Sequence, residues 1–280
     1  MNIQTIQPCG ELQPYIDFFY LIQEDDDNFL STHFSFPHVA NVISIYKEAD
    51  YFAKPGEVKI FESLKNKFLS IVQSKCQVPL KVTLSGRTDR ISIFFKSLGL
   101  NHFINVPLST QIGKVVNRFT VWENDTSFIE CLEECFNETD NHKRIKRVEK
   151  FLLSKLDDTP LGYIEKAVTL LADFETERTI EEIARCLHVS GRTFNRHFKQ
   201  MVGVSPAEYR SIARFRHSLN NKLFSKQFQR LTDIAYNSNF YDQSYFTRIY
   251  KKLTGSHPAT FFKQVEKLGD DKLIFRFVKE

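Results

Sequence analysis

The sequence lacks the marks of several classes of protein. No stretch of 18 apolar residues occurs among its 280 residues, so we expect no transmembrane helix. The segment 1–5 has neither the basic nor the apolar region of a secretory signal, and we therefore expect a cytoplasmic protein with no membrane partner. A 42% share of apolar residues argues against a mainly disordered chain.

Cysteine is scarce, and its pattern argues against a disulfide framework. The five cysteines are scattered along the chain, which is typical of reduced thiols in a cytosol. Cys131 and Cys135 lie four residues apart, on one face of an expected helix. Neither a second pair nor a histidine at ligand spacing accompanies them, so we interpret both as packing residues rather than a metal or redox site.

The chain also lacks recognisable catalytic patterns. We find no nucleophile–base arrangement, glycine-rich phosphate loop or carboxylate pair, and we expect neither an enzyme nor a cofactor. His33 and His38 are five residues apart, whereas a metal site would usually place two histidines closer and add a carboxylate, so we expect no metal there. For a further aromatic set we favour ordinary core packing over contact with an apolar or ring-shaped ligand: Trp122, Phe94, Phe95 and Phe103.

What the sequence does contain is an uneven distribution of charge. The whole chain has a formal net charge of +4. Residues 1–160 carry 18 basic and 21 acidic residues, whereas residues 161–280 carry 20 and 13. Between Arg185 and Lys263 the counts are 14 and 3, a net charge of +11. Such asymmetry points to a partner of the basic half.

The length predicts about two domains, and the apolar patterns separate them. β-branched and aromatic runs at 42–46, 78–84 and 91–95 predict a strand-rich first part. From about Ser109 apolar residues recur at helical spacing, which predicts two or three helices that close an N-terminal domain. The apolar residues of these helices are Ile112, Val115, Val116 and Phe119, then Phe128, Leu132, Cys135 and Phe136, and then Ile145, Val148, Phe151, Leu152 and Leu156.

Residues 157–160 break this pattern and mark the predicted domain boundary. Thr159 is a suitable N-cap, and Pro160 a suitable first residue, for the next helix. We therefore predict an α+β protein whose β-rich, barrel-like N-terminal domain with closing helices spans 1–157. An all-α domain spans 160–265, and a tail with alternating apolar residues, for which we have no functional interpretation, spans 266–280.

The C-terminal half contains an internal repeat with an offset of 52 residues. Residues 194–207 and 246–259 share the pattern Phe-x-Arg-x-aromatic-Lys-x-apolar-x-Gly-x-x-Pro-Ala. An Ile-Ala pair precedes each copy, at 183–184 and 234–235, with an offset of 51. Since only two copies occur, we expect two copies of one small helical unit rather than a solenoid.

The first copy, about residues 179–201, predicts a helix, a tight turn and a second helix. Thr179 and Glu182 form a capping box, and Ser190 can cap the second helix. This arrangement is typical of a helix-turn-helix unit, whose second helix enters the major groove of double-stranded DNA. We expect an inward face formed by Phe194, Phe198 and Met201 and an outward face formed by Arg192, Asn195, Arg196 and Lys199.

The second copy, about residues 231–253, repeats this arrangement with a slightly longer turn at 237–241. Asp242 is the expected cap of its second helix. The expected inward residues are Phe246, Ile249, Tyr250 and Leu253, and the expected outward residues are Gln243, Ser244, Thr247, Arg248 and Lys251.

A long helix is predicted between the two units. Ser205, Pro206 and Glu208 read as an N-cap, a first helical residue and the acidic partner of a capping box. This helix would set the two reading helices about 34 Å apart, so that they meet successive major grooves on one face of DNA. Its expected exposed face holds Arg210, Arg214 and Arg216.

The side chains on these faces suggest two kinds of DNA contact. Arginine can bind guanine through two hydrogen bonds and asparagine can do the same with adenine, whereas lysines further along a helix suit phosphates. The candidates for base contacts are Arg192, Asn195, Arg196, Gln243, Ser244, Thr247 and Arg248, and the candidates for phosphate contacts are Lys199, Arg214, Lys251 and Lys252.

Residues 161–265 resemble the DNA-binding domain of the AraC/XylS family of bacterial transcription regulators. The resemblance rests most specifically on Ile234-Ala235 through Phe240, followed by Tyr245, Phe246, Arg248, Tyr250, Lys251, Lys252, Gly255, Pro258 and Phe261. It implies two helix-turn-helix units joined by a linker helix, which read an asymmetric site in a sequence-specific regulator. By position, the base-contacting places of the family fall on the seven base-contact candidates named above.

The N-terminal half is more weakly similar to the sensor domains that precede this DNA-binding domain in many family members. The resemblance implies a small β-barrel followed by helices used for dimerisation. We therefore consider a small-molecule effector, a second copy of the chain and RNA polymerase as further partners. The alternatives are a ligand-free regulator with an N-terminal scaffold, or a small-molecule-binding or enzymatic barrel fused to a DNA-binding domain.

Overall fold

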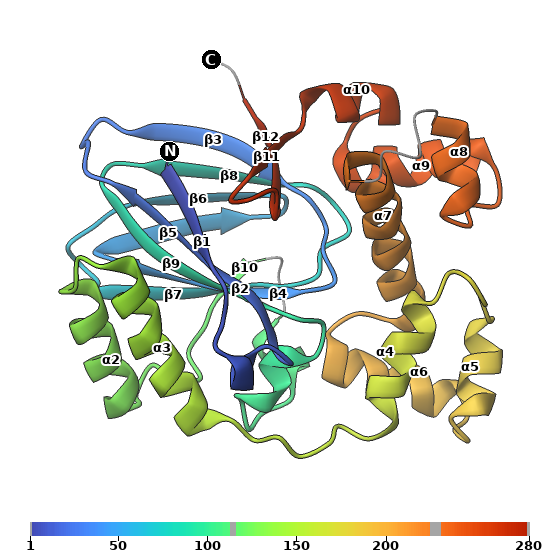
Figure 1. Cartoon of the computed structure of the whole chain (residues 1–280), viewed down its shortest axis with the longest axis horizontal. Helices are drawn as coiled ribbons and strands as arrows, with labels where there is room; N and C mark the ends of the chain where they lie inside the picture. Colours follow the sequence, from blue (N-terminus) through green and yellow to red (C-terminus); the bar gives the residue numbers. More distant parts are fainter. Residues whose placement is uncertain (1, 113–115, 225–230, 279–280) are drawn as a thin grey trace.

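The computed structural model describes residues 2–112, 116–224 and 231–278. It consists of a β-rich N-terminal domain beside a helical C-terminal domain (Figure 1), which confirms the predicted α+β class. Within the described residues, no helix is both long and apolar enough to cross a membrane.

Two six-stranded sheets form the N-terminal domain and pack face to face. Their neighbouring strands are antiparallel except for the parallel pair β6 and β8. The first sheet runs β1 (Asn2–Ile6), β2 (Ile16–Glu24), β9 (Thr88–Phe95), β4 (Asn41–Lys47), β7 (Phe68–Gln73) and β10 (Val116–Arg118). The second runs β11 (Glu266–Leu268), β12 (Leu273–Phe277), β3 (Leu30–Ser35), β8 (Leu80–Ser85), β6 (Glu57–Glu62) and β5 (Ala49–Lys54).

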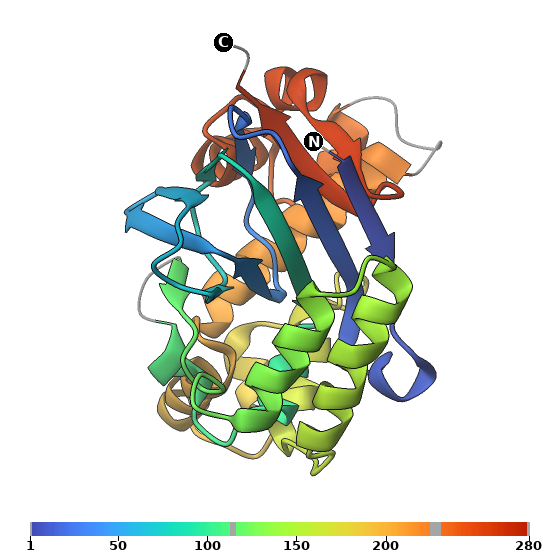
Figure 2. The same ribbon diagram turned by 90° about the vertical axis from the view of Figure 1, so that its left-hand side faces the viewer.

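Helices α2 (Thr126–Phe136) and α3 (Asn141–Lys155) cover the outer face of the first sheet (Figure 2). Because side chains alternate along a strand, Ile91, Ile93 and Phe95 of β9 face these helices. Asp125 and Asp140 cap the two helices by accepting hydrogen bonds from backbone amides.

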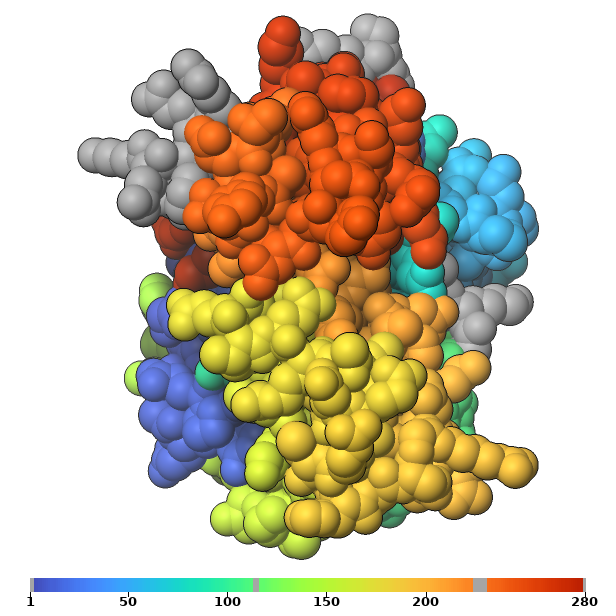
Figure 3. Space-filling view, turned by 90° about the vertical axis from the view of Figure 1, so that its right-hand side faces the viewer, coloured from blue at the N-terminus to red at the C-terminus, as the bar shows by residue number. Residues whose placement is uncertain are grey.

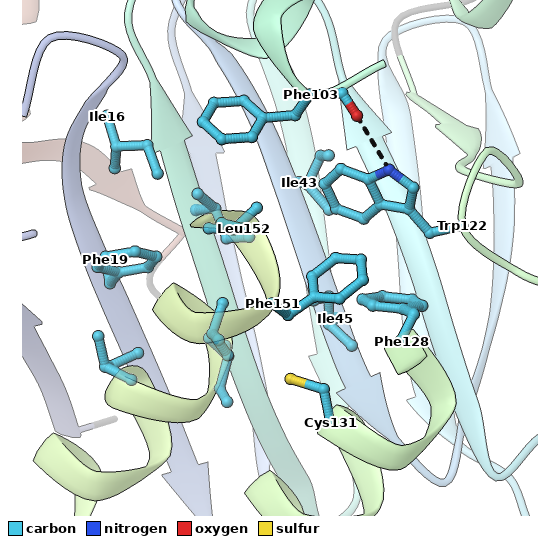
Figure 4. Close-up of a cluster of buried hydrophobic side chains, with 14 of the residues drawn as sticks. Ile16, Phe19, Ile43, Ile45, Phe103, Trp122, Phe128, Cys131, Phe151 and Leu152 are labelled. Carbon is cyan, nitrogen blue, oxygen red and sulfur yellow. Dashed lines mark hydrogen bonds between the residues drawn. The ribbon is translucent and has the colours of Figure 1, made fainter. Parts of the chain in front are cut away.

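Trp122 and the two free cysteines Cys131 and Cys135 lie in a hydrophobic core, as the sequence indicates. Trp122 is buried under α2 and α3, and its Nε1 donates to the carbonyl oxygen of Phe103 at 3.2 Å (Figure 4). Cys131 and Cys135 are buried in the same cluster, and burial raises the pKa of the two thiols to about 12 and about 11. Both cysteines therefore act as packing residues.

Two local predictions are wrong. Val116 lies in strand β10, which pairs with β7, and not in a helix; Val115 lies outside the described residues. The spacing of the apolar residues fits a single helix, but it fits equally well the observed short helix α1 (Leu108–Gln111) followed by the edge strand β10. Pairing of β10 with β7 decides which of the two forms. Thr159 does not cap a helix, because its amide and hydroxyl donate to the carboxylate of Asp157.

The tail returns to the N-terminal domain. Strands β11 and β12 form a hairpin that pairs with β3 through Phe275 and Ser35. The apolar side chains of β12 contact Phe18 and Phe94 of the first sheet. The alternating residues of the tail thus lie on one face of a strand, and Ile274 on its other face is buried in the second core of the C-terminal domain. Two 3₁₀ helices, η1 (Gly10–Leu12) and η2 (Gly99–His102), complete the N-terminal part.

The C-terminal domain has two cores, which share the linker helix α7. The first core packs around Phe194 and Phe198, and the second around Phe246 and Tyr250. The helices are α4 (Tyr163–Ala172), α5 (Ile180–Cys186), α6 (Gly191–Val202), α7 (Pro206–Phe224), α8 (Leu231–Asn237), α9 (Gln243–Thr254) and α10 (Pro258–Gln264).

Candidate nucleic-acid interface

The first helix-turn-helix unit consists of α5 and α6. The predicted capping box is present: the amide of Glu182 donates to Thr179 Oγ1 at 3.1 Å, and the Thr179 amide donates to Glu182 Oε2 at 2.7 Å. Ser190 caps α6 by accepting from the amide of Thr193 at 3.2 Å. His188 in the turn has a φ of 56°, which allows the chain to reverse between the two helices.

The second unit, α8 and α9, repeats these contacts. The amide of Phe240 donates to the carbonyl of Ala235 at 3.0 Å, as the amide of Val189 does to Ala184. Asp242 caps α9 by accepting from the amide of Tyr245 at 2.6 Å. The turn contacts are offset by 51 residues but the caps by 52, so the second turn contains one additional residue, as predicted from the repeat.

The predicted outward faces of the reading helices are accessible. On α6, Phe194, Phe198 and Val202 are buried, whereas Met201, predicted to point inward, is only half-buried. The predicted outward residues of α6 are all exposed: Arg192, Asn195, Arg196 and Lys199. A shallow hollow on α9 is lined by Gln243, Ser244, Thr247, Arg248 and Lys251.

Some candidate side chains already have partners within the chain. Asn195 Nδ2 donates to the carbonyl of Gly191 at 2.9 Å, and the Arg248 guanidinium lies 5.2 Å from the ring centre of Tyr245. Lys252 Nζ donates to Gln77 Oε1 of the N-terminal domain at 2.6 Å. A phosphate contact by Lys252 would therefore compete with a contact between the two domains.

The predicted exposed arginine face of α7 is wrong. Arg210 and Arg214 form ion pairs with Glu177, and their side chains are only 13% and 11% exposed. The Arg214 guanidinium also lies over the rings of Phe174 and Phe240. The cause is tertiary: α7 lies between the two units, and both of its sides are covered. A phosphate contact by Arg214 would require its ion pair to open.

Arg216 of α7 points into the N-terminal domain. Its Nε donates to the carbonyl oxygen of Pro37 at 2.6 Å, and its Nη2 donates to that of Phe36 at 2.7 Å. The ring of Phe36 packs edge-on against Phe261 of α10, with centres 4.8 Å apart. Further along the interface, the hydroxyls of Ser97 and Tyr209 are 2.7 Å apart. The linker helix is therefore fixed to the β-rich domain along much of its length.

Buried basic groups concentrate at this interface. Lys75 Nζ is buried and donates to Asn41 Oδ1 at 3.1 Å and to the carbonyl of Ser97 at 3.3 Å. Burial lowers the pKa of Lys75 to about 7. Burial, together with the charges of Arg216 and Lys75, also holds the pKa of His38 well below its usual value. Sequence patterns missed this group, because Asn41 and Ser97, the partners of Lys75, are distant from it in the chain.

The two units lie on the same side of the molecule. Figure 3 shows that side, with α5 and α6 in yellow to gold below and α8 and α9 in orange above. Helix α7 joins them and has 19 residues, which corresponds to a length of about 28 Å. This length is of the same order as one turn of B-DNA, about 34 Å. The two units thus lie on one side of the molecule and are joined by a helix of about that length.

The histidines singled out in the sequence have structural partners. His33 is buried against Phe275, with ring centres 4.4 Å apart. His38 Nδ1 accepts a hydrogen bond from the amide of Ala40 at 2.9 Å. Among the described residues, no group of three or more His, Cys, Asp or Glu side chains could hold a metal ion.

Comparisons with known proteins agree with this arrangement of the C-terminal domain. Residues 183–264 match the family model described as a helix-turn-helix domain. Two uncharacterized HTH-type transcriptional regulators of Bacillus subtilis (strain 168) are similar to part of the chain. YtdP is 32% identical over 92 residues, which are 33% of this chain and 12% of YtdP. YisR is 27% identical over 103 residues, which are 37% of this chain and 35% of YisR.

The similarity to these two relatives thus covers well under two thirds of either one. Among solved structures, unsaturated fatty acid-bound ToxT from Vibrio cholerae strain SCE256 is similar with a TM-score of 0.45 and 16% identity. That match covers 87% of this chain and 94% of the ToxT chain.

Proposed function

We propose that this chain, whose C-terminal domain is an AraC-type helix-turn-helix domain, is a sequence-specific DNA-binding regulator of transcription. The observation that carries the proposal is the pair of repeated units on one side of the molecule, each with exposed polar and basic residues on its second helix. Two reading helices so arranged can enter successive major grooves of one duplex.

The proposed roles of the outward residues follow from their chemistry. On α6, Arg192, Asn195 and Arg196 would contact base edges, and on α9 the residues that line its hollow would do so. Lysines further along each helix would contact phosphates. The proposed base contacts on α9 are Gln243, Ser244, Thr247 and Arg248, and the proposed phosphate contacts are Lys199, Arg214, Lys251 and Lys252.

We also propose that the N-terminal domain controls the DNA-binding domain. The support is the interface along α7, where Arg216 and Tyr209 bond to the N-terminal domain. A ligand or protein that shifts this domain would change how the two units are held. The proposed domain limits remain 1–157 and 160–265, with a tail at 266–280. Cytoplasmic location, homodimer formation and contact with RNA polymerase belong to the same proposal.

Selection of duplexes from a random pool by the full chain tests the proposed function. We expect enriched sequences with two short blocks about one helical turn apart, and affinity that falls steeply as salt rises. An unenriched pool after repeated rounds would contradict sequence-specific binding. The variant Tyr241→Ala, which changes an exposed turn residue outside the proposed contacts, serves as the control and should select the same blocks.

A further inference from the structure

Strand β5 forms one edge of the second sheet. Within the part of the chain that the structure describes, it pairs on one side only, with β6. The β5–β6 hairpin appears in light blue at the right-hand margin of Figure 3, beside the helix-turn-helix units and not between them. An edge strand presents a row of backbone donors and acceptors, so β5 can accept a further strand.

The backbone groups at this edge belong to alternate residues. Lys54 and Glu57 close a two-residue turn and pair across the hairpin, so alternate residues counted from Lys54 bond to β6. The amide and carbonyl groups of Tyr51 and Ala53 therefore point away from β6. In agreement, the Tyr51 amide donates to Oδ1 of its neighbour Asp50 at 2.8 Å.

The outer face of the hairpin exposes aromatic side chains. Tyr51 and Ile60 pack against the core between the two sheets, so the residues next to them in each strand face outward. Among these, Phe52 is 57% exposed, and Phe61, its diagonal neighbour on β6, is 39% exposed. Natural edge strands usually carry charges that discourage pairing, whereas exposed apolar groups at an edge favour it.

The sequence of β5 is complementary to itself when a second copy runs antiparallel. With Phe52 of one copy opposite Phe52 of the other, Asp50 of each copy lies opposite Lys54 of the other. In the same register Tyr51 lies opposite Ala53, so these residues can exchange about four backbone hydrogen bonds between the copies. A shift by two residues in either direction would place a charge opposite Phe52. The charges therefore select one register.

The isolated chain holds these groups in contacts that a second copy can replace. The Asp50 carboxylate accepts from the Tyr51 amide, which a carbonyl of the second copy can take over. Lys54 Nζ lies 2.8 Å from Glu57 Oε2, and Lys81 Nζ lies 3.7 Å from Oε1 of the same carboxylate. Glu57 thus keeps a basic partner when Lys54 turns toward Asp50 of the second copy.

We propose that β5 is a dimer interface, through which two copies of this chain join their second sheets into one continuous antiparallel sheet. The two-fold axis passes beside Phe52, and Asp50 of each copy pairs with Lys54 of the other. This inference names the surface for homodimer formation, and that part of the proposed function is the only part on which it rests.

The size of the contact sets its strength. Specific interfaces bury about 1,200 to 2,000 Å², and a contact between two six-residue strands lies at the lower end of that range. We therefore expect a reversible dimer with a Kd of about 10 µM. Binding of two chains to neighbouring sites on one DNA would strengthen the contact by raising the effective concentration.

Sedimentation equilibrium of the full chain without DNA, from about 1 to about 200 µM, tests the interface. The wild type should show a monomer–dimer equilibrium. Phe52→Lys should raise the dimer Kd at least about tenfold, because two lysines would meet at the two-fold axis. The matched control Leu64→Lys changes an apolar residue that is 80% exposed in the turn after β6, and it should dimerise like the wild type.

Exchange of the two charges tests the register. Asp50→Lys alone and Lys54→Asp alone each place like charges opposite one another, so each variant should dimerise at least about tenfold more weakly than the wild type. In an equal mixture, every lysine of one variant faces an aspartate of the other. The mixture should therefore form a dimer about as tight as that of the wild type, a recovery that a loss of folding could not give.

The proposal is overturned if the wild type stays monomeric over the whole concentration range, or if Phe52→Lys dimerises as tightly as the wild type. A mixture of the two charge variants that stays monomeric would overturn the register. Should Lys54→Asp not fold, the comparison of Phe52→Lys with Leu64→Lys decides. Since no DNA is present, failure of this test leaves the DNA-binding proposal untouched, and the reverse also holds.

Discussion

Arg216, on the helix that joins the two helix-turn-helix units, donates to the carbonyl oxygen of Phe36 in the N-terminal domain at 2.7 Å. A second bond from the same guanidinium reaches Pro37 at 2.6 Å. The helix that sets the spacing of the reading helices is thus held by the β-rich domain. A displacement of residues 36–37 would therefore also displace the linker helix. This contact is the means by which the N-terminal domain could control DNA binding in the proposed function.

The first prediction concerns this contact. Arg216→Met should lower the free energy of unfolding by about 2 kcal/mol, because two backbone carbonyls lose their donor at a buried interface. Urea unfolding of the full chain measures the change. Arg196→Met, which alters an exposed arginine of α6, is the matched control and should unfold like the wild type. Equal stability of Arg216→Met and the wild type would show that the contact does not hold the domains.

The second prediction is a dependence of stability on pH that comes from Lys75. Its pKa is about 7 in the folded chain and near its ordinary 10.5 when unfolded, so between these values the unfolded chain binds the additional proton. Stability must therefore rise with pH across this window, by about 1.5 kcal/mol between pH 7 and pH 8.5. The buried thiol of Cys76, whose pKa is raised from 9.0 to about 11, acts in the opposite direction only above pH 9.

Lys75→Met separates this effect from other titrations. His38, beside Lys75 and Arg216, also has a lowered pKa and adds a loss of stability as pH falls below about 6.5, its ordinary value. Between pH 7 and pH 8.5 the variant should show almost no change in free energy of unfolding, whereas the control Lys251→Met should keep the wild-type slope. A wild-type slope in Lys75→Met would rule out the assignment.

The third prediction concerns base recognition. Arg196→Ala and Arg248→Ala should each cost about 1–3 kcal/mol of binding free energy on the selected site and relax the preference at particular base pairs. Fluorescence anisotropy on the selected duplex and its single-base variants gives both quantities. If affinity instead falls equally on every duplex, the two arginines contact phosphates and the assignment to bases is wrong.

The fourth prediction concerns the phosphate contacts. Lys199→Ala and Lys251→Ala should weaken binding to all duplexes and reduce the slope of log affinity against log salt by about 1 each. The charge-preserving variants Lys199→Arg and Lys251→Arg should keep the slope. An alanine variant with an unchanged salt slope would remove that lysine from the set of phosphate contacts.

Local signals made the helix-turn-helix units predictable from the sequence. The capping box of Thr179 and Glu182 and the cap at Asp242 involve residues three apart, so a short pattern contains the whole interaction. The change of the repeat offset from 51 to 52 residues likewise predicted the additional residue in the second turn. The roles of the outward residues in DNA binding stay predictions, because the fold shows where these residues lie but not which groups of DNA they contact.

Tertiary contacts explain what the sequence could not show. In the sequence, Arg210 and Arg214 have the spacing of a solvated helix face. Their ion pairs with Glu177 join residues that are distant in the chain, so a local pattern does not show them. Val116 sits at helical spacing from its neighbours, and only pairing with β7 identifies a strand. The buried Arg90 of β9 belongs to the same class. Its alternation with Ser92 and Phe94 indicates one face of a strand, but not that a second sheet covers that face.

The central claim, that α6 and α9 read one duplex together across successive major grooves, is tested most directly by changing the spacing of the selected site. A 5-bp insertion between the two blocks rotates one of them by about half a turn. We predict that tight binding by the full chain is lost with 5 bp inserted, although each block remains intact. Unchanged affinity for the duplex with the 5-bp insertion would contradict the account, because the two helices would then bind independently or only one would read DNA.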